Sequence, residues 1–136
     1  MELESYTFVL LRRGPRALDL DEDEVERLQA AHLAHLDAMR ERGALLFAGP
    51  FRNQPDETLR GFCLYVTGLD ETRALAESDP SVRAGRMAVD VMTWLTPRGS
   101  LAPPRDPAGE LNERGEAREG LLLIPCCAVC IDATAS

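Results

Sequence analysis

Apolar residues follow two kinds of spacing along the chain, and together these predict four strands and three helical segments. Short runs of aliphatic, aromatic and β-branched residues predict strands at residues 6–11, 44–48, 61–66 and 87–95. Between the first two runs, apolar residues recur at helical spacing until about Arg42, and Gly43 suits the left-handed conformation that ends many helices. Two shorter helical segments are predicted between the last two strands.

Aspartate residues mark where these helices begin. Asp19 or Asp21 can accept hydrogen bonds from the free N–H groups at the start of the long helix, and Asp70 is placed to do so for the second. The pair Asp79-Pro80 combines an N-cap aspartate with a proline at the first helical position, and Gly85 closes that turn.

The resulting order, βαββαβ, predicts an α+β fold of the ferredoxin-like type, in which helices cover one face of an antiparallel sheet. The last strand presents apolar residues to both faces of that sheet, because Met92 and Trp94 alternate with Val91 and Leu95. A second copy of the chain can cover the face that the helices leave open. We therefore expect a homodimer.

The 136 residues fit one domain, and the composition changes near residue 100. A proline-rich stretch starts at Leu101 and leads into a charged segment that has too few apolar residues to form a core of its own. We expect a folded domain at residues 1–100, followed by a linker and a disordered tail at residues 101–136.

One position in the long helix is unusual, because His32 falls near the centre of the apolar stripe that contains Leu28, Leu36 and Met39. A buried imidazole needs a hydrogen-bond partner, and that partner selects one of its tautomers. The partner can be a backbone carbonyl, as for an ordinary core histidine, or a carboxylate that makes the ring a general base. His35, at the edge of the stripe, is most simply a half-exposed surface residue, although the pair also permits a metal ion.

The net charge of −8 and the isoelectric point near 4.7 argue against nucleic acid or an anionic membrane as a partner, since phosphate groups require a basic surface. All fifteen basic residues are arginines. The lack of lysine excludes Schiff-base catalysis and the lysine of a phosphate-binding P-loop. No apolar run approaches the ~20 residues that span a bilayer, and no signal-peptide pattern is visible, so we expect a cytoplasmic protein.

The cysteines do not form a complete metal site. Cys63 stands alone in a predicted strand, whereas Cys126, Cys127 and Cys130 cluster near the C-terminal end. Structural zinc takes four ligands, normally from two pairs, and the cluster lacks a second pair even if Asp132 is added. We expect no metal and no cofactor, and we interpret these cysteines as reduced and incidental.

Several segments together resemble one protein family. The pattern His32-Leu33-Ala34-X-Leu36 is followed by Gly43 and Gly49-Pro50, and then by Glu-Ser-Asp-Pro-Ser-Val-X-Ala-Gly at residues 77–85. The last strand ends in Trp94-Leu95-X-Pro97. Over about residues 6–99 the chain resembles the YCII-related family.

The resemblance implies a ferredoxin-like subunit that pairs into a dimeric α+β barrel, with His32 and Asp79 as an active-site dyad. A carboxylate on one imidazole nitrogen leaves the other nitrogen to act as a general base or acid. The chemistry available is then proton abstraction, isomerisation or elimination on a small molecule such as a lactone or a ring-derived acid. Arg12, Arg83 and Arg86 are candidates for binding a substrate carboxylate, and a solvated surface charge is the simpler interpretation of each.

Two functions of different class follow from these observations. In the first, the protein is a lyase or isomerase that uses the dyad. In the second, it is a noncatalytic dimeric module that binds a metabolite or a protein, and the dyad is structural. An enzyme needs the dyad at the wall of a partly apolar cavity, whereas a structural pair would be sealed from solvent.

Overall fold

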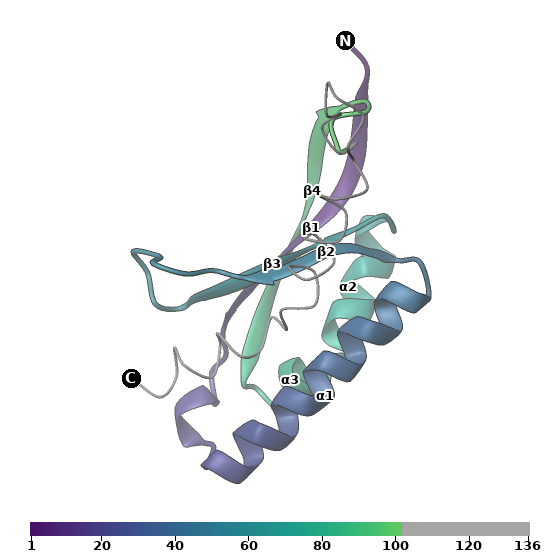
Figure 1. The fold of residues 1–136 in the computed structure, drawn as a ribbon. Coiled ribbons are helices and arrows are strands. Elements are labelled where there is room, and N and C mark those ends of the chain that lie inside the picture. The colour runs from purple at the N-terminus through teal and green to yellow at the C-terminus, as the bar shows by residue number, and fades with distance from the viewer. Residues whose placement is uncertain (102–136) are drawn as a thin grey trace, which may run out of the picture.

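A computed structural model of the chain describes residues 1–101 and shows a twisted sheet with helices on one side (Figure 1). The strands are β1 (Leu3–Arg13), β2 (Leu45–Pro50), β3 (Leu59–Tyr65) and β4 (Met87–Pro97). The helices are α1 (Glu22–Glu41), α2 (Leu69–Glu77) and α3 (Pro80–Arg83), and a short 3-10 helix, Ala17–Asp19, precedes α1. No helix within residues 1–101 combines the length and the apolar character needed to cross a membrane.

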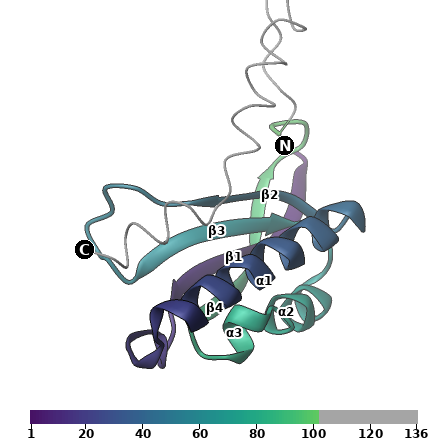
Figure 2. The same ribbon diagram turned by 60° about the horizontal axis from the view of Figure 1, so that its bottom comes forward.

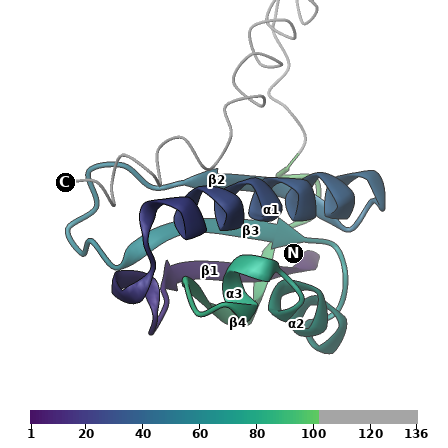
Figure 3. The same ribbon diagram turned by 90° about the horizontal axis from the view of Figure 1, so that it is seen from below.

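The strands are ordered β2-β3-β1-β4, and all three neighbouring pairs are antiparallel. This arrangement confirms the α+β, ferredoxin-like βαββαβ fold that the order of elements predicts. All three helices lie on the same side of the sheet (Figures 2 and 3). Helix α1 packs beside β2 and α3, whereas α2 and α3 pack beside β4, so α1 and α3 are neighbours on the sheet.

The hydrophobic core lies between the sheet and the helices. In β1 the residues at positions 7, 9 and 11 are buried, whereas their neighbours in the strand are more exposed, as expected for a strand with one covered face. Apolar residues of α1 pack against this face together with residues of β3 and α2. The core includes Val9, Leu11, Leu36, Met39, Leu45, Cys63, Tyr65 and Leu75.

Local signals predict most helix ends correctly. The side chain of Asp21 accepts a hydrogen bond of 2.9 Å from the backbone N–H of Glu24 and caps α1. Gly43, just after α1, has φ of 80°, a conformation that costs an L-residue steric strain. Asp79 caps α3, and Gly85 follows it with φ of 81°.

The prediction that Asp70 caps the second helix is wrong. The N-cap of α2 is Gly68, and Asp70 lies in the first turn of the helix. The first turn is closed by the backbone N–H of Thr72, which donates to the carbonyl of Gly68 at 2.8 Å. The hydroxyl of Thr72 contacts that of Thr67 at 2.6 Å, so a threonine pair stabilises this helix start without an aspartate cap.

Strands β1 and β4 are longer than the apolar pattern predicts. Their pairing runs from Leu3 opposite Pro97 to Arg13 opposite Met87. The additional residues are polar or exposed; Leu3, for example, is 49 % exposed. Backbone hydrogen bonds with the neighbouring strand extend these strands beyond the residues that contribute to the core. Two predictions lie outside the described residues. One is the tail that follows the predicted boundary near residue 100, and the other is the cluster of Cys126, Cys127 and Cys130.

Candidate functional site

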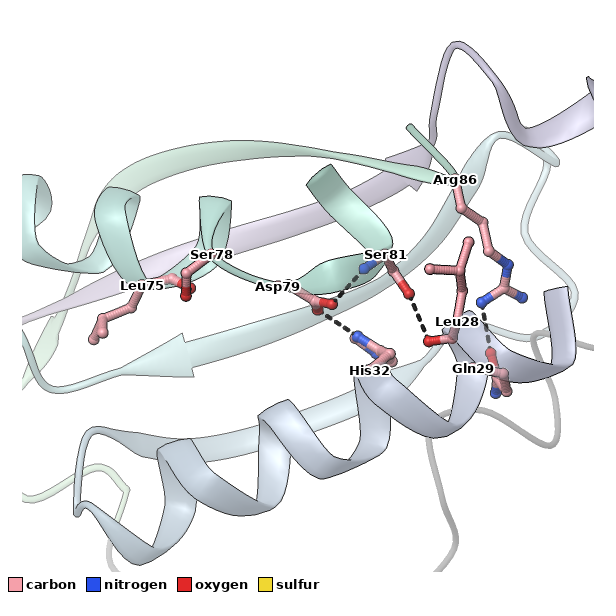
Figure 4. A network of polar contacts seen from close by, with 8 residues as sticks. All are labelled: Leu28, Gln29, His32, Leu75, Ser78, Asp79, Ser81 and Arg86. Atoms are coloured by element: carbon pink, nitrogen blue, oxygen red, sulfur yellow. Dashed lines mark hydrogen bonds and ion pairs between the residues drawn. The ribbon is translucent and has the colours of Figure 1, made fainter. Parts of the chain in front are cut away.

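His32 and Asp79 meet where α1 packs against the start of α3 (Figure 4). The Nδ1 atom of His32 lies 2.5 Å from Oδ2 of Asp79, and 47 positions separate the two residues in the chain. Their side chains are only 3 % and 4 % exposed. The structure therefore brings together the two residues that the family resemblance links.

Asp79 holds two groups with one carboxylate. Its Oδ1 atom accepts a hydrogen bond of 2.9 Å from the backbone N–H of Ser81, and its Oδ2 atom contacts the imidazole of His32. The first contact caps α3, and Pro80 at the first helical position favours the same helix start. Because Oδ1 is fixed by the cap, Oδ2 is held at a defined position beside the imidazole.

Ser81 joins α3 to α1 directly. Its side chain is completely buried, and its hydroxyl donates a hydrogen bond of 2.9 Å to the backbone carbonyl of Leu28. Leu28 lies about one helical turn before His32. This bond therefore positions α3, and with it Asp79, against the turn of α1 that carries His32.

Arg86 lies beside these contacts (Figure 4), and its backbone N–H donates a hydrogen bond of 3.0 Å to the carbonyl of Ser81. Its Nη1 atom donates a hydrogen bond of 2.6 Å to Oε1 of Gln29, and both residues are 5 % exposed. Gln29 is a site residue that sequence reasoning missed. The available signal was a polar side chain three positions before His32, on the flank of the same apolar stripe.

Arg12 and Arg83 lie in different surroundings from Arg86. Arg12 forms an exposed ion pair with Asp90, with 2.6 Å between Nε and Oδ2. It follows the buried Leu11 in β1, so it points to the face of the sheet opposite the helices and away from the dyad. Arg83 is exposed in the last turn of α3. A role for the three arginines in substrate binding stays a prediction.

His35 is partly exposed, as the sequence predicts, and it lies three positions after His32 on α1. Its ring is partly buried, and its Nε2 atom is fully buried without a hydrogen-bond partner among the described residues. Burial lowers the pKa of His35 below 6.5; the charge of Asp79 opposes this shift, and His32 adds to it. These influences place His35 within electrostatic reach of both dyad residues.

The charge of Asp79 also reaches β3. Burial raises the pKa of the Cys63 thiol to about 12 and raises that of Tyr65, and in both cases Asp79 adds to the effect. Cys63 therefore stays a thiol at neutral pH and is unsuited to nucleophilic catalysis. Within residues 1–101, no three potential metal-binding side chains gather in one place.

The arrangement is suited to proton transfer. Contact with Asp79 occupies Nδ1 of His32, which leaves Nε2 as the nitrogen that can take or give a proton. A carboxylate in this position also stabilises the imidazolium that forms when the ring takes up a proton.

Two comparisons found proteins or families that resemble this chain. A family model of the YCII-related domain matches residues 6–95, which include His32 and Asp79. No curated protein matches the chain in sequence. Among solved structures, a similar chain is that of 5-chloro-2-hydroxyhydroquinone dehydrochlorinase from Burkholderia phenoliruptrix, in complex with 2,5-dihydroxybenzoquinone. The two chains are 24 % identical, the match covers 65 % of this chain and 92 % of the other, and the TM-score is 0.46.

Proposed function

The chain belongs to the YCII-related domain family, and from this we propose that it is a small-molecule enzyme that transfers protons with His32 and Asp79. The observation that carries the proposal is the contact of 2.5 Å between Nδ1 of His32 and Oδ2 of Asp79. Such a contact keeps the proton of the neutral ring on Nδ1. The base is then Nε2, with its lone pair available.

The reaction is an isomerisation or elimination next to a carbonyl group. Nε2 of His32 removes a proton from the carbon beside the carbonyl, and the electron pair of the broken C–H bond moves toward the carbonyl oxygen to give an enolate. In an isomerisation, the imidazolium returns the proton to another carbon of the conjugated system. In an elimination, a leaving group departs with its electron pair. Neither reaction needs an oxidant or a reductant.

A lactone or a ring-derived acid fits this chemistry, and arginines would bind the carboxylate of the acid. Of the three candidates, Arg86 belongs to the same polar network as the dyad, and Arg83 lies on α3, which Asp79 caps. Arginine can hold a carboxylate with two parallel hydrogen bonds. We assign this role to Arg83 and Arg86, because Arg12 points to the opposite face of the sheet.

The protein acts as a homodimer in this proposal, with a second copy covering the open face of the sheet. That face is rich in aromatic and other apolar side chains: Phe8 stacks on Phe62 with 5.2 Å between ring centroids, and Tyr6 lies 6.3 Å from Trp94. Met92 and Trp94 are 42 % and 39 % exposed in the single chain. A sheet face of this composition is stabilised by burial, and a two-fold dimer buries the same face of both copies. This pairing would give the dimeric α+β barrel.

A second candidate function is a noncatalytic dimeric module that binds a metabolite or a protein. The observation that favours it is the burial of the dyad, since side chains that are 3 % and 4 % exposed are nearly sealed from solvent. In an enzyme, the substrate must be able to reach Nε2 of His32. In a purely structural dyad it would not reach this atom, and removing His32 would reduce stability without affecting any activity.

A proton-exchange experiment separates the two functions. The probe is α-angelica lactone, whose isomerisation to β-angelica lactone requires removal of a proton beside the carbonyl. The protein in D₂O should isomerise the probe and place deuterium on its carbons, as seen by NMR. His32→Gln should abolish this activity, whereas Asp37→Asn, an exposed change on the same helix, should retain it. No activity of the wild-type protein would contradict the proposal.

The role of the arginines is tested with an analogue that carries a carboxymethyl group in place of the methyl group of the lactone. Arg83→Ala should raise KM for the charged analogue and leave KM for α-angelica lactone unchanged. Equal effects on the two compounds would exclude carboxylate binding by this residue.

A further inference from the structure

His35 is a partly buried residue with one buried polar atom, Nε2, that the dyad does not explain. It follows His32 by three positions, so the two Cβ atoms lie about 5–6 Å apart on α1. At helical spacing, His35 lies on the same flank of α1 as Leu28, whose carbonyl accepts the hydrogen bond from Ser81. This flank of α1 is therefore the one that faces α3 and the capping carboxylate.

The Nε2 atom of His35 is fully buried and has no hydrogen-bond partner within the described part of the chain. A buried polar atom without a partner lowers stability, because it has lost its contact with water and gained nothing in return. Most such atoms in native proteins have a partner, and an exception requires an explanation. An apolar side chain at this position would avoid the loss of stability.

The ionisation of His35 suits it to donate a hydrogen bond. Burial lowers its pKa, and His32 acts in the same direction while Asp79 opposes them. The ring therefore stays neutral at neutral pH and carries a single N–H group. A neutral imidazole is known to act in enzymes as a donor to a carbonyl oxygen while another group removes the neighbouring proton.

We propose that His35 is a substrate-binding residue of the dyad site, and that its Nε2–H donates a hydrogen bond to the carbonyl oxygen of the substrate. The proposal rests on the proton-transfer function of His32. When His32 removes the proton beside the carbonyl, negative charge develops on the carbonyl oxygen, and the bond from His35 becomes stronger. His35 would thereby recognise the carbonyl group next to the carbon that loses its proton.

Two variants of His35 test this assignment with α-angelica lactone in D₂O. His35→Leu removes the donor and the unpartnered atom together, and His35→Gln keeps an N–H group at a similar distance from the backbone. We expect His35→Leu to lower kcat for isomerisation by about a hundredfold and to raise the melting temperature. His35→Gln should keep kcat within about tenfold of wild type. If His35 had a purely structural role, its replacement by leucine would not lower activity and raise stability at the same time.

The outcomes distinguish this inference from the proposed function. Wild-type activity together with full activity of His35→Leu would overturn the role of His35 and leave His32 as the base. A lower melting temperature for His35→Leu, with no activity in His35→Gln, would make His35 a structural residue and also overturn the inference. If wild type neither isomerises the lactone nor incorporates deuterium, the proposed function fails and the assignment of His35 fails with it.

Direct evidence for the contact comes from the ring nitrogens. Saturated γ-valerolactone keeps the carbonyl group but has no double bond to isomerise. Its addition to ¹⁵N-labelled protein should shift the Nε2 resonance of His35, and the His35→Gln variant should bind it with similar affinity. A shift at His32 without one at His35 would contradict the proposed hydrogen bond.

Discussion

The buried hydroxyl of Ser81 donates a hydrogen bond of 2.9 Å to the backbone carbonyl of Leu28. Ser81 follows Asp79 by two positions, and Leu28 precedes His32 by four, about one helical turn. The bond therefore connects the two segments that carry the dyad at a point adjacent to it. It fixes α3 relative to α1 more directly than apolar packing does, because a hydrogen bond depends on distance and direction.

Removal of this bond should reduce stability. Ser81→Ala is expected to lower the free energy of unfolding by about 0.5–1.5 kcal/mol, the usual contribution of one hydrogen bond. Ser78→Ala is the matched control, since its exposed hydroxyl donates to the carbonyl of Leu75 within α2. Urea denaturation of the two variants measures the difference. Equal losses of unfolding free energy in the two variants would show that the bond between α3 and α1 contributes no more to stability than a bond at the end of α2.

Asp79→Asn should keep the helix cap and move the proton of the His32 ring from one nitrogen to the other. The amide oxygen can still accept from the N–H of Ser81, which turns the amide NH₂ group toward Nδ1 of His32. The proton of the ring then moves to Nε2, which can no longer act as a base. We expect activity to fall about 10⁴-fold, as for the equivalent change in a serine-protease triad.

Two measurements check this expectation. The ¹⁵N resonances of His32 should show the proton on Nε2 in Asp79→Asn and on Nδ1 in wild type. Asp79→Ala, which loses the cap as well, should melt at a lower temperature than Asp79→Asn. Unchanged ring resonances in Asp79→Asn would show that the carboxylate does not select the tautomer.

The open face of the sheet should hold two copies together. Trp94→Glu places a charge among the aromatic residues of this face, and burial of an unpaired charge is costly, so the variant should be monomeric. Leu18→Glu is the control, because Leu18 is 84 % exposed in the 3-10 helix before α1. Light scattering in dilute solution reports the mass. A wild-type monomer would contradict the predicted dimer.

The lowered pKa of His35 predicts how stability depends on pH. As pH falls through 6.5, the unfolded chain takes up a proton at His35 before the folded protein does. Proton binding then favours the unfolded state, so this residue lowers the free energy of unfolding as pH decreases below about 6.5. In His35→Gln this contribution is absent.

Denaturation of wild type and His35→Gln between about pH 5 and pH 8 measures the effect. The difference in unfolding free energy should be constant above pH 6.5 and should change in favour of the variant below it. Parallel curves over the whole range would mean that His35 titrates normally in the folded protein.

Local signals in the sequence predict the helices and strands, and they predict Asp79 as the residue that caps α3. Gly43 and the pair Asp79-Pro80 were predictable, because a left-handed residue and an N-cap depend on a few neighbouring residues. The same reasoning failed at Asp70, where a pair of threonine hydroxyls stabilises the helix start instead. The apolar stripe of α1 could be predicted from spacing, and Leu28, Leu36 and Met39 are buried as expected.

The contacts between elements were not predictable from local pattern. His32 and Asp79 are 47 positions apart in the chain and come into contact only when it folds. Only the family resemblance implied that these two residues pair. Gln29 and Ser81 gave no sign of their partners, because a polar residue on an apolar flank can point to solvent or to a buried group. The partial exposure of His35 was predictable, since its spacing places it at the margin of the buried stripe, but the burial of its Nε2 atom was not.

The two tasks of the Asp79 carboxylate limit what evolutionary comparison can show at this position. A lineage that loses the chemistry of His32 still needs an acceptor for the N–H of Ser81, so selection for the helix start continues to retain an aspartate or a close substitute. An Asp-Pro pair at this point in a relative therefore identifies the start of the helix, whether or not the relative is an enzyme. The histidine is free of that second constraint, and its replacement in a relative is the clearer mark of lost activity.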